Sequence, residues 1–222
     1  MWIDRVERAQ AVRDLVSLAL VEVRDCGRSE PTDDFEHELD HTVSRLRERW
    51  AGQPPGRIPH LQPARALYRA IGIDPTRHRP SPEALTRRLL RGDSFPRVHL
   101  AVDLGNLWAV GSGLPVGLYD TEYLSGDRIV IRLGEAGESY AGIRKPEIHL
   151  EGRLLLADEL GPFGNPTADS ARTAVRATSR DYLFAMLAPT SIDISILDRW
   201  AAWLRERATV FLDGRARSAV LA

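Results

Sequence analysis

The sequence has one cysteine, Cys26, and one lysine, Lys145. A single cysteine excludes an intrachain disulfide and a zinc site built from cysteines. With one lysine, arginine supplies almost every positive charge, so an arginine cluster arises here without any special partner. The longest apolar run, residues 15–21, is interrupted by Ser17 and is too short to span a bilayer, so we expect no membrane association.

The length and composition favour a globular protein. The chain has 222 residues, 43% of them hydrophobic, and we expect a single domain over 1–222. Within it we expect a core at 64–180, an N-terminal strand and helix at 1–63 and a C-terminal helical segment at 181–222. Asp4 and Glu7 lie among the first residues and no apolar segment follows them at once, so no secretory signal is expected and the cytoplasm is the expected location.

The hydrophobic pattern predicts helices at both ends of a strand-rich middle. Apolar positions at spacings of three and four predict a helix over 32–50 and another near the C-terminus, and Pro and Gly delimit two short helices from 63 and from 81. Short apolar runs predict strands at 15–23, 98–103, 128–133, 146–150, 153–157 and 172–178. The fold class is therefore α+β, with a mixed or antiparallel sheet core of short strands flanked by helices at both ends.

The first helix carries the zinc-protease pattern H-E-x-x-H at residues 37–41. Metal hydrolysis is therefore one candidate function. However, His37 and His41 each lie two residues, or about 200° on a helix, from the apolar residues Phe35 and Leu39. This spacing puts both histidines on the solvent face. A catalytic zinc usually sits in a shaped cleft with a third protein ligand, and the sequence nominates none, so we predict no metal site there.

Residues 65–97 contain eight arginines against three carboxylates, an excess of five positive charges in a chain of net charge −1. Such a stretch can follow a phosphate backbone, or it can be an ordinary solvated surface. We predict Arg87, Arg88 and Arg91 as nucleic-acid contacts.

Polar residues collect after apolar runs between 98 and 133. Asp103 and Asn106 follow the first run, and Asp120 follows a Gly- and Pro-rich turn that contains Gly117. Site residues gather at such ends and turns, although Asp is also common there for turn chemistry alone. We expect these four residues to line one concavity.

The order Val102-Asp103-Leu104-Gly105-Asn106, then residues 115–120, resembles the B3/B4 editing domain of the phenylalanyl-tRNA synthetase beta subunit, which reads roughly V-D-x-T-N, then P-x-H-A-F-D. Residues 81–88 and 156–170 extend the resemblance. Gly105 stands where that family has Thr, and Gly117 where it has His.

The resemblance implies a stand-alone editing-type domain that binds aminoacyl-tRNA and hydrolyses mischarged aminoacyl esters without a cofactor. It implies Asn106 and Asp169 as catalytic residues, and its substrate-binding residues are Asp103, Gly105, Gly117, Asp120 and Ser170. The alternative is a non-catalytic module that binds tRNA, an amino acid or a protein, which the glycines at 105 and 117 favour. No ATP-site motif is present, so the chain is not a synthetase by itself.

Overall fold

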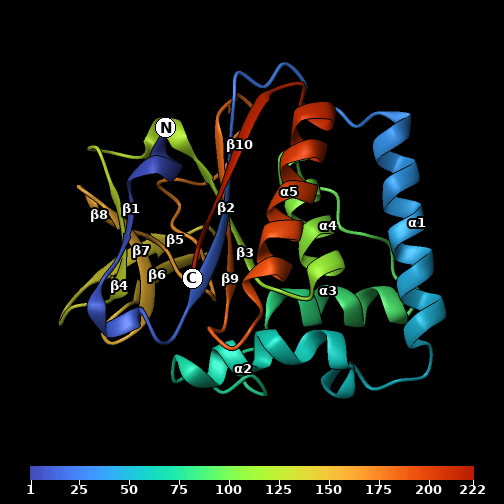
Figure 1. Ribbon diagram of the computed structural model, residues 1–222, viewed down its shortest axis with the longest axis horizontal. Coiled ribbons are helices and arrows are strands. Elements are labelled where there is room, and N and C mark those ends of the chain that lie inside the picture. The colour runs from blue at the N-terminus through green and yellow to red at the C-terminus, as the bar shows by residue number, and fades with distance from the viewer.

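A four-stranded antiparallel sheet in the order β10-β2-β9-β3 runs through the middle of the protein. The structure is a computed structural model that describes all residues, 1–222. In Figure 1 this central sheet stands between a layer of helices and a second, smaller sheet. Its strands are β2 (Ser17–Arg24), β3 (Val116–Asp120), β9 (Tyr182–Ala188) and β10 (Arg215–Leu221).

The two inner strands of this sheet are covered on both faces. In β2, Ala19 and Val21 pack into the core beneath the helices, whereas Leu18 and Leu20 pack into the core beneath the second sheet. All seven residues of β9 are buried. Because successive side chains point to opposite faces, a strand with two covered faces is apolar along most of its length. The buried Glu22 of β2 is an exception, and its carboxylate accepts hydrogen bonds from the Ile3 N–H and from Arg24.

The second sheet has the order β1-β4-β7-β8, and only its β1–β4 pair is parallel. Its strands are β1 (Val6–Arg8), β4 (Ile129–Leu133), β7 (Leu154–Asp158) and β8 (Gly161–Gly164). A separate hairpin joins β5 (Ser139–Gly142) to β6 (Lys145–His149). Single turns of 3-10 helix lie at Trp2–Arg5, Gln10–Val12, Pro55–Arg57, Pro59–Leu61 and Thr121–Tyr123.

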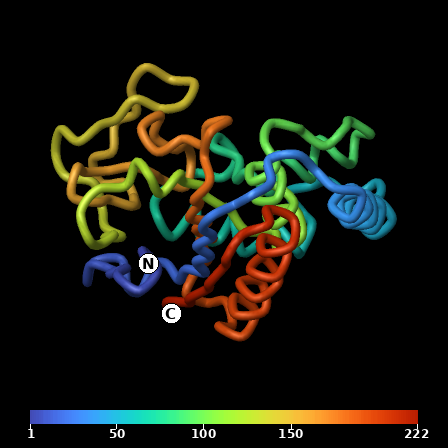
Figure 2. Tube along the Cα trace, turned by 90° about the horizontal axis from the view of Figure 1, so that it is seen from above, coloured from blue at the N-terminus to red at the C-terminus, as the bar shows by residue number.

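Helices α4 (Leu100–Ser112) and α5 (Ile194–Phe211) pack on the other face of the central sheet, and α1 (Asp33–Trp50) and α3 (Ser81–Leu90) pack against α4 and extend the same core. The short helix α2 (Gln62–Ala70) contributes Leu67 to the core between the sheets. Figure 2 shows α1 at the outer edge of the helical layer. No helix is long and apolar enough to cross a membrane. The predicted α+β class is confirmed, with helices before and after the strand-rich middle of the chain.

The predicted strand at 98–103 is wrong, because this segment enters helix α4. The ring of His99 accepts a hydrogen bond from the backbone N–H of Ala101 at the helix start, and Gly113 ends the helix in the left-handed conformation. The helix is buried on most sides, so its sequence has no polar face. A short apolar run of this kind cannot be told from a buried strand by periodicity.

The predicted strand at 172–178 is also wrong, because the chain forms no strand there and enters β9 only at Tyr182. The segment instead closes one side of the site described below. The Thr173 carbonyl accepts a hydrogen bond from the backbone N–H of Asp120 (2.9 Å), and the Arg172 guanidinium pairs with both carboxylate oxygens of Asp158 (2.9 Å each).

Candidate functional site

A pocket of about 450 Å³ opens between α4, the edge strand β3, the β5–β6 turn and the loop after β8. Its volume falls in the range of small-molecule sites. Most of its lining is apolar, and the polar groups that reach it are few. The lining includes Val98, Val102, Gly105, Asn106, Val116, Leu118, Ile143, Arg144, Lys145, Ile148, Ala168, Asp169 and Val175.

Asp169 is the one carboxyl group in this lining. Its Oδ1 accepts a hydrogen bond from the hydroxyl of Tyr119 at 3.0 Å. Removal from water raises the pKa of Asp169 to about 7, against the lowering effect of the hydrogen bonds from Tyr119 and the Leu118 backbone. The side chain therefore exchanges a proton near neutral pH, which is the property of an effective general acid or base.

The Tyr119 hydroxyl occupies a space that two glycines leave open. Tyr119 is 1% exposed, and its ring packs edge-on against Phe163 at 4.8 Å. A Cβ atom at Gly117 or at Gly164 would overlap the Tyr119 hydroxyl. Gly117 thus allows the tyrosine to reach Asp169 and itself offers nothing to a ligand.

A network of hydrogen bonds fixes the loop that carries Asp169. Asn165 Oδ1 accepts from the backbone N–H groups of Thr167 (2.8 Å) and Ala168 (3.1 Å), and its Nδ2 donates to the Tyr140 hydroxyl (2.8 Å). That hydroxyl in turn donates to the Ala168 carbonyl at 2.6 Å. Asp169 is therefore held against the pocket by the residues just before it.

Sequence reasoning missed Tyr119, Tyr140 and Asn165. A signal existed for Tyr119, because residues 117 and 119 of one strand point to the same face. A glycine two positions before a tyrosine in β3 leaves room for the phenol to tilt across it. Nothing in the sequence brings Tyr140 and Asn165 together, since they meet only through the β5–β6 hairpin.

Two of the residues predicted around Asp103 lie on the pocket wall. Gly105 and Asn106 are neighbours on α4, and both line the pocket with Asp169. The Asn106 side chain is partly exposed and makes no hydrogen bond to the protein, so its amide is free to bind a ligand. A Cβ at Gly105 would lie 3.4 Å from the Phe184 ring, an ordinary contact.

Four other predicted site residues do not line the pocket. Gly117 lies behind Tyr119, as described above. The Asp103 carboxylate accepts from the Val98 N–H and from Arg97 Nε, both at 2.9 Å. The Asp120 carboxylate accepts from the Glu122 N–H at 3.0 Å and from the Ser179 hydroxyl. Ser170 is buried, and its hydroxyl accepts from the Arg172 N–H at 3.1 Å. These polar side chains support the local backbone.

The mouth of the pocket combines apolar and positive side chains. Val98 is 68% exposed and Ile143 57% exposed, although both are apolar and neighbour the opening. Arg144 in the β5–β6 turn and Lys145 at the start of β6 are exposed and form no ion pair. The opening therefore suits a ligand with an apolar part and a negative part.

Most of the positive charge predicted for residues 65–97 is paired within the protein. Arg65 is buried and donates to Glu83 at 2.6 Å, and Arg97 binds both Glu36 and Asp103. The side chains of Arg87 and Arg88 on α3 are exposed, and so is that of Arg91 just after this helix, where it pairs with Asp93.

His37 and His41 are exposed, as predicted from the apolar spacing of α1. Thr32 caps this helix by accepting a hydrogen bond from the Phe35 N–H. No group of three or more His, Cys, Asp or Glu side chains lies close enough together to hold a metal ion. The H-E-x-x-H pattern therefore has no third protein ligand, and the metal-hydrolase hypothesis has no structural support.

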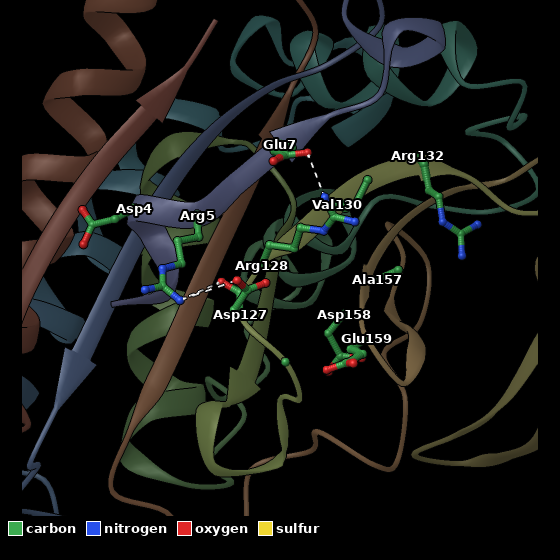
Figure 3. A pocket seen from close by; sticks show the side chains of 11 residues that line it. Asp4, Arg5, Glu7, Asp127, Arg128, Val130, Arg132, Ala157, Asp158 and Glu159 are labelled. Carbon is green, nitrogen blue, oxygen red and sulfur yellow. Dashed lines mark hydrogen bonds and ion pairs between the residues drawn. The ribbon is translucent and has the colours of Figure 1, made fainter.

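A broad hollow of about 1000 Å³ lies along the outer face of the second sheet (Figure 3). Its charged side chains largely satisfy one another. Arg5 approaches Asp127 at 4.0 Å, and Arg128 approaches Glu7 at 3.9 Å. Two of its eleven lining residues are hydrophobic, so it is a solvated sheet face.

We expect Gly117→Ala to destabilise the protein and Gly105→Ala not to. The methyl group at 117 collides with the buried Tyr119 hydroxyl, and such overpacking costs about 1–3 kcal/mol. At 105 the contact is ordinary and alanine favours the helix by about 1 kcal/mol. Urea denaturation of the two variants measures this. Equal stabilities would show that Tyr119 is not confined as described.

The stability of the protein should fall with pH relative to the Asp169→Asn variant. The pKa of Asp169 is about 7 in the folded state and near 3.8 when unfolded, so the folded state holds the proton more tightly. Between about pH 4 and pH 7 the unfolding free energy of the wild type should fall below that of Asp169→Asn by up to about 1.4 kcal/mol for each pH unit. Above about pH 7 the difference between the two proteins should stay constant. Denaturation curves at four pH values test this, and a gap independent of pH would contradict it.

The comparisons with known proteins agree with the resemblance seen in the sequence. No curated protein matches the chain. A solved N-terminal fragment of the phenylalanyl-tRNA synthetase beta subunit from Pyrococcus horikoshii is similar at 12% identity and a TM-score of 0.45, over 98% of this chain and 54% of that fragment. The chain thus spans about half of that fragment. The family model of the B3/4 domain matches residues 63–199, which include every residue of the pocket. The chain belongs to the B3/4 domain family.

Proposed function

We propose that the pocket binds the aminoacyl end of a charged tRNA and hydrolyses its ester in trans. The observation that carries this proposal is an apolar pocket with one carboxyl of pKa about 7 and one free amide, in the segment that matches the B3/4 domain. The apolar walls around Val102, Val116 and Leu118 suit an apolar amino-acid side chain. The substrate class is therefore an ester of an apolar amino acid.

In this mechanism the Asp169 carboxylate accepts a proton from a water molecule as the water oxygen bonds to the ester carbonyl carbon. The Asn106 amide donates a hydrogen bond to the carbonyl oxygen, which becomes negative. The bond from carbon to the ribose oxygen then breaks, and the ribose oxygen leaves with the proton from Asp169. The ester is already activated, so positioning and proton transfer suffice without a cofactor.

The surroundings of the pocket fit the rest of this substrate. Arg144 and Lys145 at the mouth would meet the last phosphates of the tRNA, and Arg87, Arg88 and Arg91 a more distant part of its backbone. We assign Asp103, Asp120 and Ser170 to supporting the backbone around the pocket, and Gly105 to the close approach of substrate. A cytoplasmic location, where charged tRNA is used, accompanies the proposal.

We also propose that residues 1–222 act as one domain with a core at 64–180. The N-terminal flank supplies β2 and the C-terminal flank supplies β9 and β10, and both complete the sheet to which β3 belongs. Removing either flank would uncover one face of the core.

The second candidate is a non-catalytic module for the same ligand. Gly105 and Gly117 favour it, because neither offers a side chain to the reaction. In that case the protein binds aminoacyl-tRNA and releases no amino acid.

Asp169→Asn should lower the kcat/KM of deacylation about 100-fold or more, since loss of a general base typically costs that much. A panel of tRNAs charged with apolar amino acids supplies the substrate. The control is Asp127→Asn, an 80% exposed carboxyl in the bend before β4, which should leave the rate unchanged. Wild-type kcat/KM should rise with pH to a plateau above about 7. Binding without release of amino acid would support the module instead.

Replacing Arg87, Arg88 and Arg91 with Glu should weaken tRNA binding about tenfold or more and reduce its salt dependence, because each neutralised phosphate releases counterion. Thermal stability should change little, because exposed charges contribute little to folding. Filter binding at two salt concentrations measures this. The matched control replaces Arg5, Arg13 and Arg128, also exposed, with Glu. If both variants weaken tRNA binding equally, the effect is one of general charge. If the Arg87/Arg88/Arg91 variant binds tRNA as the wild type does, these residues are not part of the interface.

A further inference from the structure

A second hollow, of about 560 Å³, lies between helices α1, α4 and α5 and shares no residue with the apolar pocket. Three of the five tryptophans of the chain line it: Trp50, Trp200 and Trp203. All three are only partly buried, although each packs against the main core. The groove thus keeps indole surface in contact with solvent.

The indoles are held in fixed positions. Trp200 and Trp203 pack edge to face with ring centres 5.8 Å apart. A Cβ at Gly111 on α4 would lie 3.1 Å from the Trp200 ring, so this glycine lets the ring settle closely on the helix. Rigid aromatic rings present their surface to a ligand at little cost in conformational entropy.

A histidine and two arginines of α1 line the groove together with these rings. His41, Arg45 and Arg49 follow one another at four-residue spacing, which places them along one row of the helix. Arg45 and Arg49 make no ion pair, and the Arg49 guanidinium lies 4.9 Å from the centre of the Trp50 ring. Only one carboxylate, Glu38, lines the groove, and it lies 3.5 Å from Arg207. The chain has a net charge of −1, so this positive charge is local.

The Arg207 guanidinium lies 4.9 Å from the centre of the Trp203 ring and covers part of that indole. We propose that this groove binds single-stranded nucleic acid, with a base stacked on Trp200 and phosphates on Arg45 and Arg49. Stacking surfaces beside a row of cations are the arrangement that recognises unpaired bases. An acidic peptide would use the arginines and leave the indoles without a planar partner, and a duplex would keep its bases inside. The inference does not depend on ester hydrolysis in the other pocket.

The test is quenching of tryptophan fluorescence by an eight-nucleotide oligouridylate at 50 and 200 mM salt. We expect the oligonucleotide to bind, with a plot of the logarithm of the association constant against the logarithm of salt concentration that has a slope of about −1.4. This slope corresponds to two phosphates of a single strand being neutralised. Arg45→Gln with Arg49→Gln should weaken binding about tenfold or more and flatten that slope. Both side chains are exposed, so the variant should fold, as circular dichroism checks. The control is Arg5→Gln with Arg128→Gln on the second sheet, which should bind as the wild type does.

Three results would overturn the proposal. They are no quenching at 50 mM salt, equal binding by the Arg45/Arg49 variant and the wild type, and equal or tighter binding of polyglutamate or of a duplex. Trp200→Leu separates stacking from charge, because it should weaken oligouridylate binding while leaving the salt slope near −1.4.

Discussion

The fold depends on burying both faces of strands β2 and β9. Their alternate side chains fill two separate cores, one beneath the helices and one beneath the second sheet. Strand β3 is the edge of the same sheet, and Val116 and Leu118 in it are only partly covered. The apolar pocket opens at this edge, where the layer of helices no longer covers the sheet completely. The site is therefore a consequence of where the central sheet ends, and α4 supplies its opposite wall.

Within the pocket, one hydrogen bond links shape to chemistry. The phenol of Tyr119 reaches Asp169 only because Gly117 and Gly164 leave space for its hydroxyl. Burial of this pair raises the pKa of Asp169 to about 7, so a carboxyl that is normally ionised exchanges its proton near neutral pH. The glycine at 117 stands where the resembling synthetase domain has histidine. In this chain the glycine serves the tyrosine two residues later, and the titrating group of the pocket comes from the loop after β8.

The elements that could be predicted from the sequence are those with one buried face and one exposed face, because their apolar residues then recur with a clear period. Helices α1 and α5 have an apolar stripe, and their existence was predictable from it. Helix α4 is apolar almost all round, so its pattern matched a strand. The motif selected Gly105, Asn106 and Asp169, which line the pocket. The same pattern also selected Asp103 and Asp120, whose carboxylates bind the local backbone. Pairings between distant residues, such as Arg97 with Glu36, could not be predicted because only the folded chain joins them.

The measurement that tests the account most directly is an NMR titration with an adenosine that carries an apolar amino acid through a stable amide in place of the ester. The account predicts that the backbone signals of Gly105, Asn106 and Asp169 shift together in proportion to occupancy, and that Asp169→Asn alters this response. The indole signals of Trp200 and Trp203 report separately on binding of the adenine base in the other groove. Shifts confined to those indoles, or no shift at saturating ligand, would contradict the assignment of the pocket as the aminoacyl site.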